Sequence, residues 1–163
     1  MCEQGRRTLF LFYLFWAIYF LLISVRVGTW NADFVAGMEP KNGDIVIQGK
    51  RGLDAFPGTD LEAQLRRNNI KTVVLGGLLT NCCVESTMRT AFEKGFNVVT
   101  LKDCTAATSH EGQAAAAGPH GTWGMFSTPM TKNEFLDAIQ APISTIDLVI
   151  IIDSILFIRM KIC

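Results

Sequence analysis

The chain has 163 residues, which is enough for one domain with a substantial hydrophobic core. Lys and Arg balance Asp and Glu at 15 each, and no basic cluster occurs, so the composition argues against a nucleic-acid partner. The five cysteines include an adjacent pair but no C-x-x-C pair, which is typical of a reduced, intracellular set. No metal is expected, because neither His110 nor His120 forms a ligand-like cluster with a cysteine.

The first segment in chain order is Thr8–Val25, which carries no charge and is flanked by Arg6, Arg7 and Arg26. Its length is close to the lower limit of about 17 residues for a membrane-spanning helix, so a single-pass membrane segment through residues 8–25 is one interpretation. The arginine pair would then favour a cytoplasmic N-terminus. The alternatives are one or more buried strands, or a non-native extension from an incorrect gene model.

The middle of the chain predicts strands and helices in alternation, from apolar runs, turn residues and capping signals. In order these are a strand within Gly43–Gly49, a helix at Thr59–Arg67, a strand at Thr72–Gly76, a helix at Cys83–Lys94, a strand at Phe96–Leu101, a short helix from Ser109 to Ala117, a short strand beginning at Met125–Phe126, and a helix after Thr131. Two capping boxes are expected, Thr59 with Glu62 and Thr131 with Glu134.

A second apolar block runs from Ile143 to Cys163 and is rich in β-branched residues. Asp147 and Asp153 interrupt it, and carboxylates inside a bilayer are unfavourable. We therefore expect a strand or a tail at residues 141–163 rather than a second membrane span.

Strands that alternate with helices indicate βαβ units, so we expect an α/β fold with a doubly wound, Rossmann-like parallel sheet in three α/β/α layers. In such sheets ligands bind beyond the carboxyl ends of the strands. Lys50 and Cys83 both follow predicted strands and are therefore candidate site residues.

Cys83 stands where a helix is expected to begin, a few residues after the strand that ends in Gly76 and Gly77. A helix N-terminus carries partial positive charge and unpaired N–H groups, which favour the reactive thiolate. The same N–H groups can stabilise the oxyanion that forms on an attacked carbonyl. This arrangement predicts a thiol nucleophile.

The sequence Thr80-Asn81-x-Cys83-Val84, followed by Thr87, Arg89 and Ala91, resembles the nucleophile motif of the isochorismatase-like cysteine hydrolases. This superfamily includes nicotinamidases, N-carbamoylsarcosine amidohydrolases and ureidoacrylate hydrolases. The segment from Gly43 to Lys50 resembles the family strand that carries a lysine, and Asp103–Ala107 resembles the loop after a later strand. The similarity runs from about Gly28 to about Ile139.

The resemblance implies hydrolysis of a small amide or ureido C–N bond through a thioester intermediate, with no cofactor. Cys83 would be the nucleophile, and Lys50 the cation that favours its thiolate or orients substrate. It further implies a cis peptide just before Thr80 and an oxyanion site at Leu79 and Thr80. Asn81 would shape the turn, and His120, Trp123 and Phe126 are candidate pocket residues.

The family aspartate that acts as general base and acid has no counterpart in this sequence at the expected place. Residues 1–27 contain no aspartate, so the sheet is expected to be incomplete at its N-terminus. The alternative hypothesis is therefore an inactive or truncated relative that serves as a binding or structural protein, with membrane tethering as one option. The sequence contains no D-x-H motif, which metal binding in the nicotinamidase branch of the family would need. This is a second reason to expect no metal.

The expected organisation is an apolar N-terminal segment at residues 1–27, a hydrolase domain at 28–140 and the apolar segment at 141–163. The resemblance implies a small-molecule amide substrate, a cytoplasmic location and a homo-oligomer as one option. The membrane segment at residues 8–25 would instead imply a membrane location.

Overall fold

The computed structural model describes residues 33, 36, 39–40, 42–140, 150–151 and 156–158. The chain divides into two compact units, Met1–Asp33 and Phe34–Cys163, and every described helix and strand belongs to the second. The expected membrane helix or substitute strand at residues 8–25 lies outside the described residues. None of the helices that the structure describes is long and apolar enough to cross a membrane.

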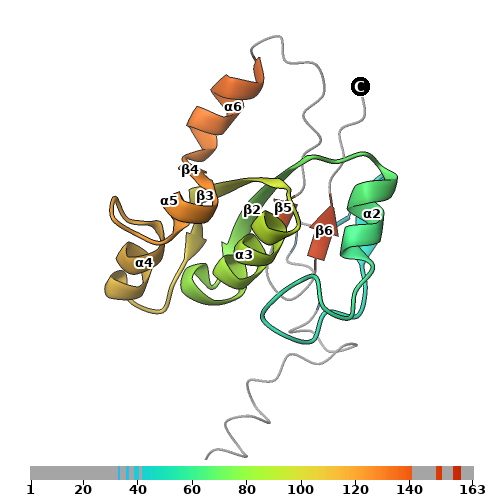
Figure 1. Cartoon of the computed structure of the whole chain (residues 1–163), viewed down its shortest axis with the longest axis horizontal. Helices are drawn as coiled ribbons and strands as arrows, with labels where there is room; N and C mark the ends of the chain where they lie inside the picture. The colour runs from blue at the N-terminus through green and yellow to red at the C-terminus, as the bar shows by residue number, and fades with distance from the viewer. Residues whose placement is uncertain are drawn as a thin grey trace, which may run out of the picture. The chain divides into compact units, whose positions relative to one another are not determined.

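Short strands and helices follow one another along the described chain (Figure 1). They are β1 (Ile45–Ile47), α2 (Leu61–Arg67), β2 (Thr72–Leu78), a π-helical turn (Thr80–Val84), α3 (Glu85–Glu93), β3 (Asn97–Ala106), α4 (His110–Ala117), α5 (Trp123–Phe126), β4 (Thr128–Met130), α6 (Lys132–Gln140), β5 (Ile150–Ile151) and β6 (Leu156–Ile158). Four strands form a parallel sheet in the order β4-β3-β2-β5, whereas β1 pairs antiparallel with β6 in a second sheet.

Alternate residues of β2 pack against helices on opposite faces of the parallel sheet. Val73 and Leu75 belong to the same buried cluster as Met88 of α3, whereas Val74 packs with Phe135 of α6. This follows from the two-residue period of a strand. Helices thus cover both faces, and the predicted α/β class with a parallel sheet between helical layers is confirmed.

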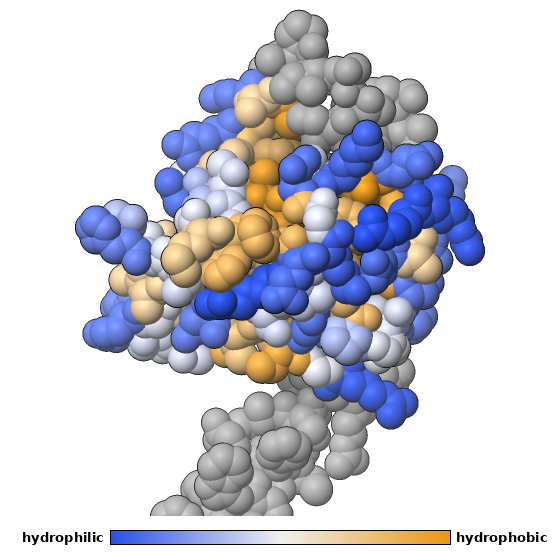
Figure 2. All heavy atoms as spheres, viewed as in Figure 1, coloured by the Kyte–Doolittle hydropathy of each residue, from blue (hydrophilic) through white to orange (hydrophobic). Residues whose placement is uncertain are grey.

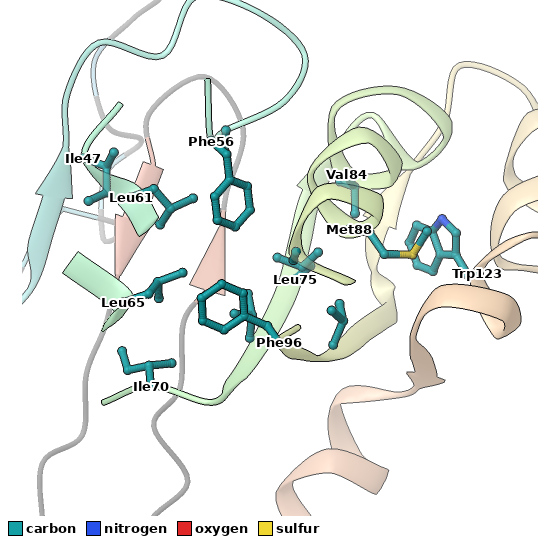
Figure 3. Close-up of a cluster of buried hydrophobic side chains, with 14 of the residues drawn as sticks. Ile47, Phe56, Leu61, Leu65, Ile70, Leu75, Val84, Met88, Phe96 and Trp123 are labelled. Carbon is teal, nitrogen blue, oxygen red and sulfur yellow. The ribbon is translucent and has the colours of Figure 1, made fainter. Parts of the chain in front are cut away.

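The main core joins β1, α2, β2 and α3 in one cluster of apolar side chains (Figure 3). Ile47 of β1 lies with Leu61 and Leu65 of α2, and the cluster continues through Leu75 to Trp123. Leu61 and Leu65 are fully buried, and burial of each contributes about 1.5–3 kcal/mol to folding. Figure 2 shows polar side chains over much of one face of the molecule, with apolar residues between them.

The prediction of a capping box between Thr59 and Glu62 is wrong. Helix α2 begins at Leu61, and the Thr59 hydroxyl accepts from the Leu61 N–H at 3.3 Å. Glu62 instead accepts a hydrogen bond from Lys94 Nζ at 2.6 Å, and it also pairs with Arg66. The cation that follows the end of α3 therefore holds the carboxylate that was predicted to cap α2.

The second expected capping box is confirmed. The Thr131 N–H donates to Glu134 Oε2 at 2.6 Å, and the Glu134 N–H donates to Thr131 Oγ1 at 3.2 Å. Asp103 adds a further cap from β3, because its Oδ1 accepts from the Lys132 N–H at 2.7 Å. Asp103 therefore fixes the start of α6.

The prediction that a strand begins at Met125–Phe126 is wrong, because these residues belong to α5. The Ser127 N–H donates to the Trp123 carbonyl at 2.8 Å, which closes a helical turn around a buried tryptophan. The strand starts only at Thr128.

Candidate functional site

Strand β2 leads directly into the turn that carries the candidate nucleophile. β2 ends at Leu78, and the peptide bond between Leu78 and Leu79 is cis. The resemblance predicted a cis bond just before Thr80, so the observed bond lies one residue earlier. Thr80 itself is fully buried.

Cys83 lies in the π-helical turn, immediately before α3. The N–H groups of Cys82 and Val84 both donate to the Leu79 carbonyl, at 3.1 and 3.2 Å. Cys83 is half-buried. The thiol therefore occupies the start of a helical segment at the carboxyl end of a parallel strand, where the sequence placed it.

Two glycines let β2 and β3 approach each other before this turn. Gly77 has φ +118°, a conformation that side chains rarely adopt. A Cβ added at Gly76 would lie 3.3 Å from the Cys104 carbonyl oxygen of β3. The sheet register shifts between Leu75 and Gly77, so this close approach accompanies an irregularity in the ladder.

The first turn of α4 packs directly on the turn of Cys83. The Thr80 hydroxyl donates to Gln113 Oε1 at 2.6 Å. A Cβ added at Gly112 would lie 2.9 Å from Asn81 Nδ2, so the Asn81 side chain lies close to the backbone of α4. Ser109 caps this helix by accepting from the Gly112 N–H. Asn81 and Thr80 thus shape the turn through contacts with α4.

Lys50 follows β1, and its Nζ donates to the Gly52 carbonyl at 2.8 Å. This bond holds the ammonium group beside the loop that follows β1. That loop is in turn fastened to α3, the helix that Cys83 precedes.

We name this fastening the loop latch, and it consists of Asp54, Ala55, Thr87 and Thr90. The buried Ala55 N–H donates to Thr87 Oγ1 at 3.1 Å, and the Thr90 hydroxyl donates to Asp54 Oδ2 at 2.6 Å. The loop after Lys50 is therefore bound to the helix after Cys83 by two hydrogen bonds.

The three candidate pocket residues have different surroundings. His120 is exposed in the turn between α4 and α5. Trp123 is fully buried in the main core near Met88 (Figure 3), and its Nε1 has no hydrogen-bond partner among the described residues. Phe126 packs under the Arg89 guanidinium, 4.4 Å from the ring centre. Their predicted pocket role stays a prediction.

Cys104 provides a contrast with Cys83 because it is exposed on β3. Partial burial of the sulfur, and next the neighbouring Asp103 carboxylate, raise the pKa of the Cys104 thiol. Cys104 is therefore less ionised at neutral pH than an ordinary cysteine. Within the described residues no cluster of His, Cys, Asp or Glu could hold a metal ion.

The sequence did not identify Gln113 or Asp54 as site residues. Gln113 forms a hydrogen bond with Thr80, which is 33 positions away in the sequence, and Asp54 forms one with Thr90, which is 36 positions away. Neither residue lies in a motif, and contacts over such separations leave no local signal in the sequence.

Comparison with known proteins gives a family assignment. The family model of the isochorismatase domain matches residues 21–132. An uncharacterized isochorismatase family protein, YecD of Escherichia coli, is 56% identical, and the match covers 53% of this chain and 58% of YecD. The ureidoacrylate amidohydrolase RutB of Agrobacterium fabrum is 33% identical, with 72% of this chain and 51% of RutB covered. The chain thus spans about half the length of these curated relatives.

Solved structures agree with this assignment. An isochorismatase-like hydrolase from Alkaliphilus metalliredigens has a TM-score of 0.63 and 34% identity, covering 71% of this chain and 65% of that chain. N-carbamoylsarcosine amidase from Thermoplasma acidophilum has a TM-score of 0.54 and 28% identity, covering 64% and 57%. Both likenesses include the α/β architecture described above.

Proposed function

Because the chain belongs to the isochorismatase family, we propose that it is a cysteine hydrolase that cleaves a small amide or ureido C–N bond. The observation that carries this proposal is the position of Cys83, half-buried at the start of a helical segment beyond the carboxyl end of β2. Relatives that are named amidohydrolase or amidase support the bond type.

In the proposed reaction the Cys83 thiolate attacks the substrate carbonyl carbon, and a C–S bond forms. Backbone N–H groups of the turn at Leu79–Cys83 stabilise the negative oxygen of the tetrahedral intermediate. The C–N bond then breaks, and the nitrogen leaves with a proton from a general acid. Water hydrolyses the resulting thioester, which releases the acid product and restores the thiol.

Lys50 is proposed as the cation that favours the thiolate or orients the substrate. Its ammonium is a compact charge on a flexible stem, and the loop latch ties its loop to α3. The ammonium has three N–H donors, so its bond to the Gly52 carbonyl leaves two for the thiolate or the substrate.

The general acid and base is the component that the sequence does not supply in residues 1–27. Among the described carboxylates, Asp54, Asp103 and Glu85 bind a hydroxyl, a backbone N–H and a guanidinium, respectively. A scan of Asp→Asn variants should begin with Asp153. This residue lies outside the described residues but follows β5 by two positions in the sequence, and β5 runs parallel to β2.

The test is turnover of a panel of small primary amides and ureido compounds by the wild type and by Cys83→Ala. We expect Cys83→Ala to lower kcat/KM by about 10³-fold or more, because the nucleophile is removed. Cys82→Ser and Cys104→Ser are matched controls and should keep activity near the wild-type value.

Intact-mass analysis of rapidly quenched wild type should show the acyl adduct, and hydroxylamine should remove it. Equal turnover by Cys83→Ala and wild type would refute the mechanism. Absence of turnover in wild type across the panel would instead favour a binding or structural role.

A further inference from the structure

The C-terminal strands pair with the two strands that lead to the candidate catalytic residues. β5 lies parallel to β2, with Val74 opposite Ile150 and Leu75 opposite Ile151. β6 lies antiparallel to β1, with Ile47 opposite Leu156. β5 therefore contacts the strand before Cys83, and β6 contacts the strand before Lys50.

β1 lies outside the four-stranded sheet, so its described strand partner is β6 rather than β2. β5 and β6 also contact each other. The connection through the described strands thus runs from β1 to β6, from β6 to β5, and from β5 to β2.

A pair of three-residue strands is marginal by itself, since small isolated hairpins are unstable in water. β1 therefore depends on its surroundings for a fixed position. Ile47 is buried against α2, and the loop latch fixes the chain after Lys50, but backbone pairing with β6 fixes the register of β1 itself.

We propose that β5 and β6 form a positioning segment of the site, which holds β1 so that Lys50 acts on Cys83. This inference rests on the proposed function, because it assigns the segment a role through Lys50. The segment touches no substrate in this proposal and acts only through the strands that it pairs with.

The experiment measures the rate at which iodoacetamide alkylates Cys83 in the full chain between pH 6 and 9, by peptide mass spectrometry. The test variant combines Leu156→Pro and Phe157→Pro, because neighbouring residues of an antiparallel strand alternate in donating to the partner. At least one ladder hydrogen bond is thereby removed. Leu156→Val with Phe157→Ile keeps both N–H groups and is the matched control.

We expect the proline pair and Lys50→Ala each to slow alkylation at neutral pH by about tenfold, as when one neighbouring cation no longer favours a thiolate. The combination of the proline pair with Lys50→Ala should be no slower than Lys50→Ala alone, since both changes remove the same interaction. A general loss of stability would not produce this non-additivity. The control should label at the wild-type rate.

Far-ultraviolet circular dichroism checks that the proline variant is folded. If the proline variant is not folded, Leu156→Gly with Phe157→Gly replaces it in the same comparison with Lys50→Ala. The glycines weaken the pairing without removing an N–H group. The inference is overturned if the β6 variant is alkylated at Cys83 at the wild-type rate. It is also overturned if the β6 substitutions and Lys50→Ala slow alkylation multiplicatively when combined. If Lys50→Ala alone has no effect on labelling, Lys50 does not favour the thiolate, and the positioning role proposed for β5 and β6 fails with it. Activity that survives Cys83→Ala would instead refute the proposed function itself.

Discussion

The loop latch allows a sharp test, because Thr87→Val removes one hydrogen bond with little change in volume. Thr87 is 1% exposed, and its Oγ1 accepts from the N–H of Ala55, which is completely buried. Valine has the same branched shape but no acceptor, so the Ala55 N–H would be left buried and unpaired. That loss costs about 1–3 kcal/mol of unfolding free energy.

Thr87→Ser is the matched control, since it keeps the hydroxyl and removes one buried methyl group. Its cost should be about 0.8 kcal/mol from lost apolar burial. Because the two costs can overlap, stability alone does not separate the variants. The Ala55 amide does separate them, since only the valine variant deprives it of an acceptor.

The assay combines urea unfolding with hydrogen exchange of the Ala55 amide measured by NMR. We expect Thr87→Val to lower the urea midpoint with an unchanged slope, and to accelerate Ala55 exchange more than it accelerates exchange in β2 and β3. Thr87→Ser should leave Ala55 protected. If Thr87→Val unfolds within about 0.3 kcal/mol of wild type while Ala55 stays protected, the latch does not hold the loop.

Three further predictions concern the surroundings of the site. Gln113→Leu removes the acceptor of the buried Thr80 hydroxyl and should cost about 1–3 kcal/mol of unfolding free energy by thermal denaturation, whereas Gln113→Glu keeps an acceptor and should cost less. The Thr131 N–H and hydroxyl lower the pKa of Glu134 below its ordinary 4.5. The ionised Glu134 therefore stabilises the fold above pH 4.5, and this contribution is lost as the pH falls through the lowered pKa of the folded state. Glu134→Gln should make the free energy of unfolding in urea less dependent on pH in this range. An unchanged pH dependence in Glu134→Gln would contradict the assignment. Cys104, despite its exposure, should react with iodoacetamide at pH 7 more slowly than a cysteine in an unstructured peptide, because its pKa is raised; an equal rate would contradict the effect of burial and Asp103.

The parts of the fold that could be predicted are those with a strong local pattern. β2 and α3 lie within two residues of the expected bounds, because an apolar run ends at glycines and a helical period follows. Thr131 with Glu134 was predictable for the same reason, since a capping box lies within four residues.

The failures involve residues whose partners are distant in sequence. Glu62 has the spacing of a capping residue but binds Lys94 at the end of α3, 32 positions away. Phe126 is an aromatic residue of the kind that strands favour, but it ends a helical turn whose first residue, Trp123, is buried. For the site, the position of Cys83 followed from its motif, whereas the bond of Gln113 to Thr80 depends on how α4 docks.

The parallel pairing of β5 with β2 also has a consequence for synthesis of the chain. β2 emerges from the ribosome well before β5, and at about 5–20 residues per second the delay is roughly 4–15 s. During that time β2 lacks its β5 partner, and strand edges without a partner are open to pairing with other chains. The nascent protein therefore passes through an interval in which its apolar strand beside the thiol is vulnerable to aggregation, and chaperone supply during translation should influence the yield of native protein.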